Sequence, residues 1–169
     1  MTGIGHDIPR LTKVRAAGGN VLRVRFAGER RERRVDLTGL LARSTHFAPL
    51  LDDTKAFVKV TIVEDGLGVA WPVGTKWGHL DLSASTLRRI AEEQQPMTGA
   101  DFAKWREALD LSLTEAATLL GASRRTVMSY PRRRELPALV AIACRALARD
   151  KHLLAAHYLP ARKSTRPAA

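Results

Sequence analysis

The spacing of hydrophobic residues changes once along the chain, near residue 95. Before that point, apolar and polar residues alternate over short stretches, which is typical of half-buried strands. After it, apolar residues recur three and four positions apart, as on one face of a helix. The sequence therefore predicts an α+β protein in four parts: a small, mostly antiparallel sheet domain with short helices at 1–91, a linker at 92–97, an all-α domain at 98–158, and a disordered basic tail at 159–169.

The first part contains five stretches that are predicted to form strands: 11–16, 21–26, 31–37, 57–63 and 67–71. Gly18-Gly19-Asn20 indicates a tight hairpin between the first two, because these residues accept a positive φ. The β-branched stretch 57–63 is the clearest strand of all, and Pro72 is expected to end the last one. Short helices are predicted at 38–42, with Thr38 as the N-cap, and from Ser83 or Ser85 to Ile90.

Capping residues mark the helices of the second part. Thr98 precedes a helix whose inward face carries Phe102, Trp105 and Leu109. Ser112 and Glu115 have the spacing of a capping box, in which each side chain binds the other's backbone amide. The helix that they open is expected to stop at Gly121, because a helix often ends at a left-handed residue.

A further helix is predicted at 124–130, capped by Ser123, with Val127 and Tyr130 facing inward. Two helices joined by a short glycine-containing turn form a helix-turn-helix unit, within a bundle of four to five helices. Ala116 and Ala117 suit this unit, since two short helices that cross steeply need small side chains at their contact. A helical bundle that uses the same hairpin only for packing is the alternative, and the exposed arginines that open the helix disfavour it.

The segment from Leu111 to Val127 resembles the Cro-type, lambda-repressor-like helix-turn-helix family, and the similarity covers roughly 98–150. The resemblance implies that 124–130 is a recognition helix lying in the major groove of DNA. It implies base contacts, including bidentate arginine–guanine pairs, from Arg124, Arg125, Met128 and Ser129. It implies phosphate contacts from Ser112, Ser123, Arg132, Arg133 and Arg134.

Two positions depart from the family pattern. The family usually has a glutamate where this chain has Pro131, and a glycine where it has Arg133. Because proline cannot continue a helix and disfavours helical angles in the residue before it, the recognition helix is expected to end abruptly and Tyr130 to leave the helical region. An arginine-rich loop without its usual glycine should follow.

The first part is similar to the domain of unknown function 2442 family, which consists of short α/β modules, some of them joined to a helix-turn-helix. The similarity lies in Leu22-x-Val24-x-Phe26, Val35-Asp36-Leu37, Phe47-x-Pro49-Leu50, Phe57-x-x-Val60 and Ala70-Trp71-Pro72. It implies an occasional role as the antitoxin of a toxin–antitoxin operon. These motifs are mostly core hydrophobics, so no functional residue follows from them.

The charge of the chain is strongly positive and unevenly placed. The net charge is +11 over 169 residues. Residues 1–97 hold 15 Lys and Arg against 11 Asp and Glu, whereas residues 98–169 hold 13 against 6. Such a balance in one half indicates a polyanionic partner. In the first part, Arg30, Arg31, Arg33 and Arg34 form either a second phosphate patch or a charged edge strand, and we favour the edge strand.

Other classes of function find little support. No stretch approaches the ~20 apolar residues that cross a membrane, and the first residues lack a signal-peptide core. The single cysteine, Cys144, allows no intramolecular disulfide, and we expect an inert buried thiol in a reducing cytoplasm. The histidines show no metal-ligand spacing, Asp52-Asp53 is interpreted as a solvated loop, and no phosphate-binding glycine loop is present. We therefore expect no enzyme activity, metal or cofactor.

These patterns together predict a sequence-specific regulator of transcription that binds double-stranded DNA as a homodimeric repressor. The sheet domain would then supply a surface for dimerisation, a ligand or a partner. The alternative is an antitoxin whose first part neutralises a toxin protein and whose second part represses its own operon. No membrane partner is expected.

Overall fold

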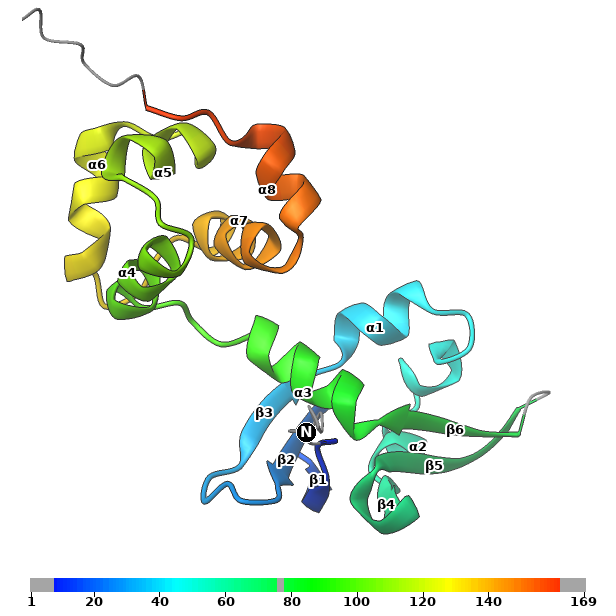
Figure 1. The fold of residues 1–169 in the computed structure, drawn as a ribbon. Coiled ribbons are helices and arrows are strands. Elements are labelled where there is room, and N and C mark those ends of the chain that lie inside the picture. The colour runs from blue at the N-terminus through cyan, green and yellow to red at the C-terminus, as the bar shows by residue number, and fades with distance from the viewer. Residues whose placement is uncertain (1–7, 76–77, 162–169) are drawn as a thin grey trace, which may run out of the picture. The chain divides into compact units, whose positions relative to one another are not determined.

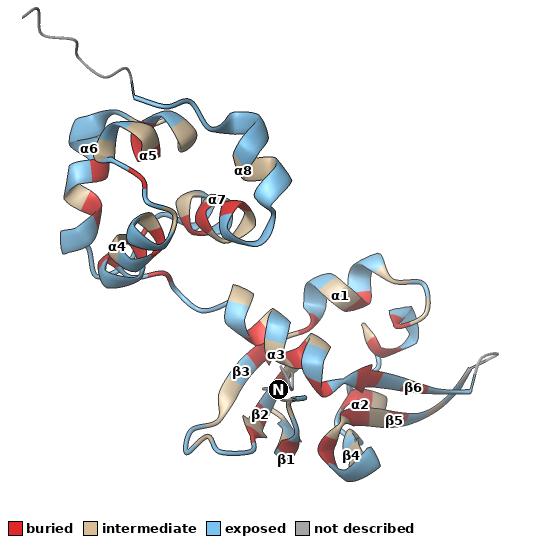
Figure 2. Cartoon of the chain, viewed as in Figure 1, coloured by how far each residue is buried: buried red, intermediate tan, exposed pale blue. Residues whose placement is uncertain are grey.

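The computed structural model describes residues 8–75 and 78–161, and the chain divides into two compact units, Met1–Gln94 and Gln95–Ala169. Each unit has its own hydrophobic core, and the two cores share no residue (Figure 2). The architecture is α+β, as predicted. The expected linker 92–97 includes two residues that are helical instead, because Glu92 and Glu93 form the end of α3 (Ala84–Glu93) in the first unit.

The first sheet consists of three antiparallel strands in sequence order (Figure 1): β1 (Leu11–Ala16), β2 (Val21–Phe26) and β3 (Arg33–Asp36). Gly18 and Gly19 turn the predicted hairpin at positive φ values of 89° and 54°. The third strand is shorter than the predicted 31–37. Glu32 precedes the strand, and its carboxylate pairs with Lys13 and Arg15 of β1.

The second sheet is also antiparallel: β4 (Thr61–Val63), β5 (Gly68–Thr75) and β6 (Gly78–Ser83). The prediction of a strand over 57–63 is wrong in its first half. The chain forms a short helix, α2 (Thr54–Phe57), because the Asp53 carboxylate accepts the Ala56 amide at 2.9 Å and caps it. Phe57 is fully buried, and its carbonyl accepts a hydrogen bond from Trp71 Nε1.

The ends of β5 and the whole of β6 also differ from prediction. β5 continues through Pro72 to Thr75, and the pairing with β6 shifts in register between Trp71 and Gly74. Such an irregularity accommodates a proline that cannot donate to the ladder. The sequence did not predict β6, which has only two buried apolar positions, Leu80 and Leu82.

Short helices complete the first unit: α1 (Thr38–Arg43), the 3₁₀ helices η1 (Ala48–Leu50) and η2 (Glu64–Gly66), and α3. The prediction that Thr38 is the N-cap of α1 is wrong. Leu37 takes that position, and the Asp36 carboxylate accepts the Thr38 amide at 3.0 Å. Of the two predicted starts of α3, Ser83 is the cap, and its hydroxyl accepts the Thr86 amide.

The second unit is a bundle of helices, as predicted: α4 (Gly99–Ala108), α5 (Leu113–Leu119), α6 (Arg124–Ser129), the 3₁₀ helix η3 (Tyr130–Arg132), α7 (Ala138–Arg149) and α8 (Lys151–His157). Of the predicted tail 159–169, residues 162–169 lie outside the described residues, and the Ala161 amide binds Glu115. None of the helices within 8–75 and 78–161 is long and apolar enough to span a membrane.

Candidate nucleic-acid interface

The helix α5 begins and ends as its sequence predicts. The Ser112 hydroxyl accepts the Glu115 amide at 3.2 Å, and the Glu115 carboxylate accepts the Ser112 amide at 2.9 Å, so the capping box is complete. Gly121 follows the helix at a φ of +60°. The hydroxyl and the amide of Ser112 therefore both bind Glu115 at the start of the same helix.

The helix α6 is held by its cap and by one buried face. The Ser123 hydroxyl accepts the Thr126 amide at 3.0 Å. Val127 is fully buried, in the same core as Ala116 and Ala117 of α5. Because Val127 is buried in a core that it shares with these small side chains, it fixes which face of α6 points inward.

The opposite face of α6 carries the four residues predicted to contact bases. At 100° per residue, Arg124, Met128, Arg125 and Ser129 fall within an arc of about 140°. The two arginines are exposed, and Met128 keeps 51% of its surface in solvent. The Ser129 hydroxyl donates to the Thr126 carbonyl at 2.6 Å, so toward a base it can act as an acceptor.

The expectation that Pro131 drives Tyr130 out of the helical region is wrong. Tyr130 has φ −59° and ψ −44°, because the chain continues from α6 into η3. The Tyr130 ring is buried and packs edge-on against Phe102, with ring centroids 5.2 Å apart. The predicted recognition helix 124–130 therefore ends as α-helix at Ser129 and closes with a 3₁₀ turn.

The loop after α6 has a backbone that does not need the glycine of the family. Arg133 has φ −81° and ψ 139°, an extended conformation open to any residue. Two hydrogen bonds hold this loop to the start of α4: the Gly99 amide donates to the Arg133 carbonyl at 3.0 Å, and the Leu136 amide donates to the Met97 carbonyl at 2.8 Å. The arginine segment is thus fixed to the bundle at both ends.

The arginines of this loop are exposed, and they are not equivalent. The Arg133 guanidinium lies 5.8 Å from the centroid of the Tyr130 ring, in cation–π distance. Arg132 and Arg134 make no such contact among the described residues. Arg133 therefore also contributes to the packing over Tyr130, whereas its neighbours are oriented only by the backbone.

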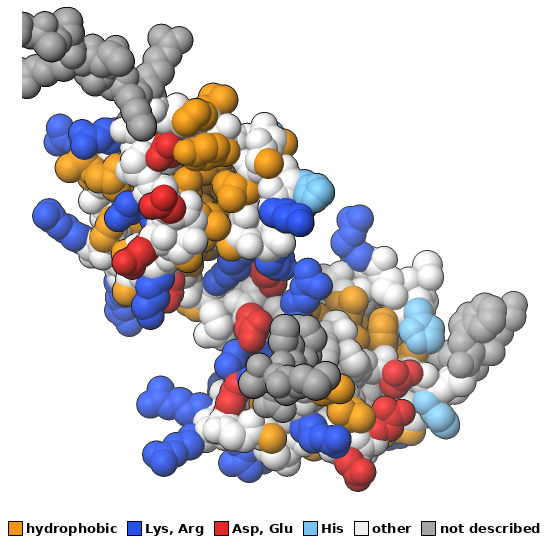
Figure 3. All heavy atoms as spheres, viewed as in Figure 1, with side chains coloured by type: hydrophobic (Ala, Val, Ile, Leu, Met, Phe, Trp, Pro, Cys, Tyr) orange, Lys and Arg blue, Asp and Glu red, His pale blue; other side chains and the backbone are white. Residues whose placement is uncertain are grey.

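The positive charge around α6 is not compensated locally. Within the described residues, none of the guanidinium groups of Arg124, Arg125, Arg132 and Arg134 makes a hydrogen bond or an ion pair. Figure 3 shows Lys and Arg side chains gathered over α6. This surface can therefore attract an anion without first breaking a salt bridge.

One acidic residue near this surface has a structural role that sequence reasoning only partly found. Glu115 Oε1 accepts hydrogen bonds from the Tyr158 hydroxyl at 2.6 Å and from the Ala161 amide at 3.1 Å. With the Ser112 hydroxyl and amide, these donors lower the pKa of Glu115 to about 2. The capping box predicts the bonds to Ser112, but no local pattern predicts Tyr158, which is 43 residues away.

The sequence analysis did not find two further features of the second unit, a second capping box and the close packing at Gly99. The sequence carries a signal for the capping box alone. Thr98 and Asp101 form a second capping box, at the start of α4, whose T-x-x-D spacing is readable. Gly99 has no such signal. A Cβ at this position would overlap the carbonyl oxygens of Tyr130 and Pro131. Only glycine at position 99 therefore allows α4 to approach η3 this closely.

The remaining chemistry of the chain is sparse. No group of three or more metal-ligating side chains occurs within 8–75 and 78–161. Cys144 is buried, as predicted, and burial raises the pKa of its thiol to about 12. A thiol of this kind is protonated and inert at neutral pH.

Comparisons with known proteins add one similarity. No family model matches the chain, and a search of curated proteins finds no match. The chain is similar to a crystal structure of a putative DNA binding protein from Nitrosomonas europaea, with 30% sequence identity over 92% of this chain and 94% of that chain, at a TM-score of 0.42.

Proposed function

We propose that this chain is a sequence-specific regulator of transcription that binds double-stranded DNA, of the Cro-type helix-turn-helix kind, and that it acts as a dimeric repressor in the cytoplasm. One observation carries the proposal. Arg124 and Arg125 are exposed and unpaired in the first turn of α6, while Val127 holds the opposite face of that helix in the core. The helix thus presents two guanidinium forks on a rigid support, the geometry that reads guanine edges.

The phosphate contacts of the proposal come from both sides of α6. Ser112 and Ser123 lie at the starts of the two helices, and Arg132 and Arg134 extend from the loop that is fixed to α4. Contacts of this kind set the position of a recognition helix on the duplex without reading sequence.

A dimer is part of the proposal, because one short recognition helix touches few base pairs. Related proteins place two such helices about one helical turn, ~34 Å, apart. The helix α7 exposes Leu139 and Ile142, at 81% and 57%, three residues apart on one face. Large apolar side chains gathered in solvent are suited to contact with a second copy of the chain.

Selection of bound sequences from random duplex DNA by the full-length protein tests the proposal. We expect a single site with an inverted repeat, and a complex whose sedimentation mass contains two copies of the chain. A selected pool without sequence preference would overturn sequence-specific recognition. A site without a repeat, bound by one copy, would overturn the dimer.

Matched arginine variants on the selected site separate base contacts from phosphate contacts. Arg124→Ala should cost ~1–3 kcal/mol on the specific duplex and relax preference at one base position. Arg134→Ala should weaken binding to specific and scrambled duplexes alike and flatten the slope of log K against log salt by about one unit. If Arg134→Ala changed the base preference and Arg124→Ala changed only the salt slope, α6 would lie on the duplex in the opposite orientation. Arg133 is unsuitable for this comparison because it also packs on Tyr130.

A further inference from the structure

The solvent face of the first sheet carries a row of arginines in direct register. Arg23 of β2 lies opposite Arg15 of β1 on one side and opposite Arg34 of β3 on the other. In the next row, Arg25 lies opposite Lys13. Five cations therefore occupy one face of a three-stranded sheet, at alternate positions along the strands.

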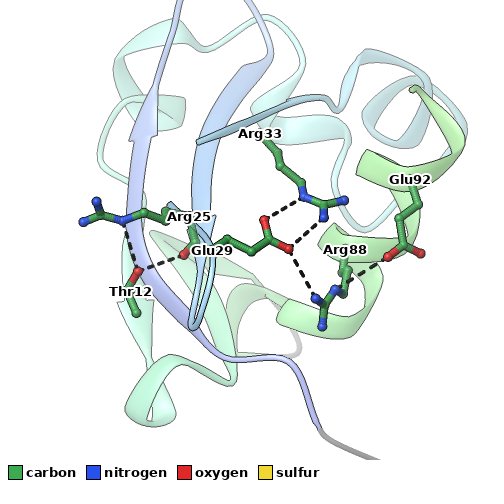
Figure 4. Close-up of polar contacts among 6 residues, drawn as sticks. All are labelled: Thr12, Arg25, Glu29, Arg33, Arg88 and Glu92. Atoms are coloured by element: carbon green, nitrogen blue, oxygen red, sulfur yellow. Dashed lines mark hydrogen bonds and ion pairs between the residues drawn. The ribbon is translucent and has the colours of Figure 1, made fainter. Parts of the chain in front are cut away.

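The alternation of the strands separates this face from the core. Leu22, Val24 and Phe26 of β2 point the other way and are buried. Arg33 of β3 also points to that side: its guanidinium binds Glu29, which binds Arg88 of α3 as well (Figure 4). The guanidinium groups of Arg33 and Arg88 both lie over the Phe26 ring. The neighbours Arg33 and Arg34 thus differ in role. Arg33 packs at the edge of the hydrophobic core, and Arg34 lies on the solvent face of the sheet.

Such a row is unfavourable for the isolated sheet. Like charges directly opposite each other on antiparallel strands are destabilising. The protein compensates only the flanks: Glu32 pairs with Arg15 and Lys13, and Asp36 pairs with Arg34. Arg23, in the centre, is exposed and makes no hydrogen bond or ion pair with any residue in 8–75 or 78–161. A charged edge strand alone would not need an arginine at this central position.

We propose that this basic face, formed by Lys13, Arg15, Arg23, Arg25 and Arg34, is a second phosphate-binding surface that contacts the backbone of duplex DNA without reading its sequence. It rests on the proposed function, since it adds affinity for the duplex that α6 reads. The chemistry of the face favours a nucleic acid over a protein. Among its paired positions only Val21 is apolar, and that side chain is half buried, so the face lacks the apolar and aromatic anchors that dominate protein interfaces.

The test is a salt titration of full-length variants on a scrambled duplex, followed by fluorescence anisotropy. Each arginine that contacts a phosphate contributes about one unit to the slope of log K against log salt. Arg23→Gln should therefore flatten the slope by about one unit, and Arg23→Gln/Arg25→Gln by about two. Arg89→Gln is the matched control, because this exposed arginine on α3 has the same charge and lies outside the sheet. Its slope should remain that of the wild type.

Stability provides a second readout with the opposite sign. Because Arg23 is repelled by Arg15 and Arg34, Arg23→Gln should leave the thermal midpoint unchanged or raise it while it weakens DNA binding. A variant that loses both stability and binding would indicate a structural role and overturn the proposal. So would a slope for Arg23→Gln equal to that of Arg89→Gln, or a loss of affinity confined to single-stranded RNA.

Repeating the titration with Arg124→Ala/Arg125→Ala as the parent distinguishes this surface from α6. If α6 reads the sequence and the sheet contacts phosphates, the parent loses discrimination, and Arg23→Gln still flattens its residual salt slope. If the wild type shows no sequence preference but Arg23→Gln flattens the slope, the proposed function fails and the basic face stands. If the wild type discriminates sequences and Arg23→Gln has no effect on the slope, the proposed function stands and the phosphate-binding role of the basic face fails.

Discussion

At the scale of single residues, Glu115 connects more of the second unit than its place in a capping box suggests. One carboxylate oxygen closes the start of α5, and the other holds the chain beyond α8 through Tyr158 and Ala161. The hydrogen bond to Glu115 also raises the pKa of the Tyr158 phenol. The ionised carboxylate is therefore part of the structure that presents α5 and α6.

A dependence of stability on pH follows from Glu115. Its pKa falls from the usual 4.5 to about 2 in the folded chain, so its contribution is complete above pH 4.5 and is lost as the pH falls toward 2. Glu115→Gln should lower the stability at pH 7, and its difference from the wild type should shrink between pH 4.5 and pH 2. Urea denaturation at a series of pH values measures this.

The control for Glu115 is Glu107→Gln, which removes an exposed carboxylate of α4 that makes no side-chain hydrogen bond or ion pair among the described residues. It should leave the pH dependence as in the wild type. An equal loss of stability for Glu115→Gln at pH 7 and at pH 2 would show that the ionised form of Glu115 is not what matters.

At the scale of elements, the contact between α4 and η3 positions the arginine loop. The Gly99 amide binds the Arg133 carbonyl, and the absence of a side chain at Gly99 lets the carbonyl oxygens of Tyr130 and Pro131 lie against α4. Tyr130 and Phe102 pack beside this contact. The loop that carries Arg132 and Arg134 is thus held by backbone geometry, which does not depend on the arginines themselves.

Gly99→Ala should break this contact. The added methyl group overlaps two backbone oxygens that cannot rotate away, and overpacking of this kind costs ~1–3 kcal/mol. Gly39→Ala is the control, because Gly39 also lies in a helix but has open space around a Cβ, so alanine should stabilise it slightly. Urea denaturation followed by circular dichroism compares the two. Equal effects would contradict the close approach of α4 and η3.

At the scale of the whole molecule, the two units have separate cores. The core of the first unit includes Phe26, Phe57 and Trp71, and that of the second includes Phe102, Trp105 and Tyr130. The last residue of the first unit is tied to its own sheet, since the Gln94 side chain accepts the Asp36 amide and donates to the Asp36 carbonyl.

We therefore predict that the fragment 95–161 folds by itself. Its helices bury their apolar faces on one another, and Ala161 is included because Glu115 binds its amide. Circular dichroism of the fragment should show a helical spectrum and a cooperative thermal transition, and a fragment shortened to 95–157 should melt at a lower temperature. A fragment 95–161 without helical signal would show that the two units depend on each other for folding.

Much of the secondary structure was predictable where local rules act alone. The caps Ser83, Ser112 and Ser123 and the hairpin glycines are in their expected roles, because each satisfies its own turn of backbone. Prediction was wrong where a distant contact decided the outcome. Phe57 lies in a β-branched stretch but is helical, since Asp53 caps the turn and Trp71 binds the Phe57 carbonyl.

The sequence by itself determined the positions of the helix-turn-helix elements and the excess of positive charge, because capping and periodicity are local properties. Only the tertiary structure decided which cations share a surface. The strand register aligned Arg15, Arg23 and Arg34 from three strands and turned Arg33 toward Glu29 and Phe26. It also brought Tyr158 to Glu115 and Gly99 to the loop after α6. Sequence order does not encode such pairings, because the side chains involved meet only when strands and helices pack.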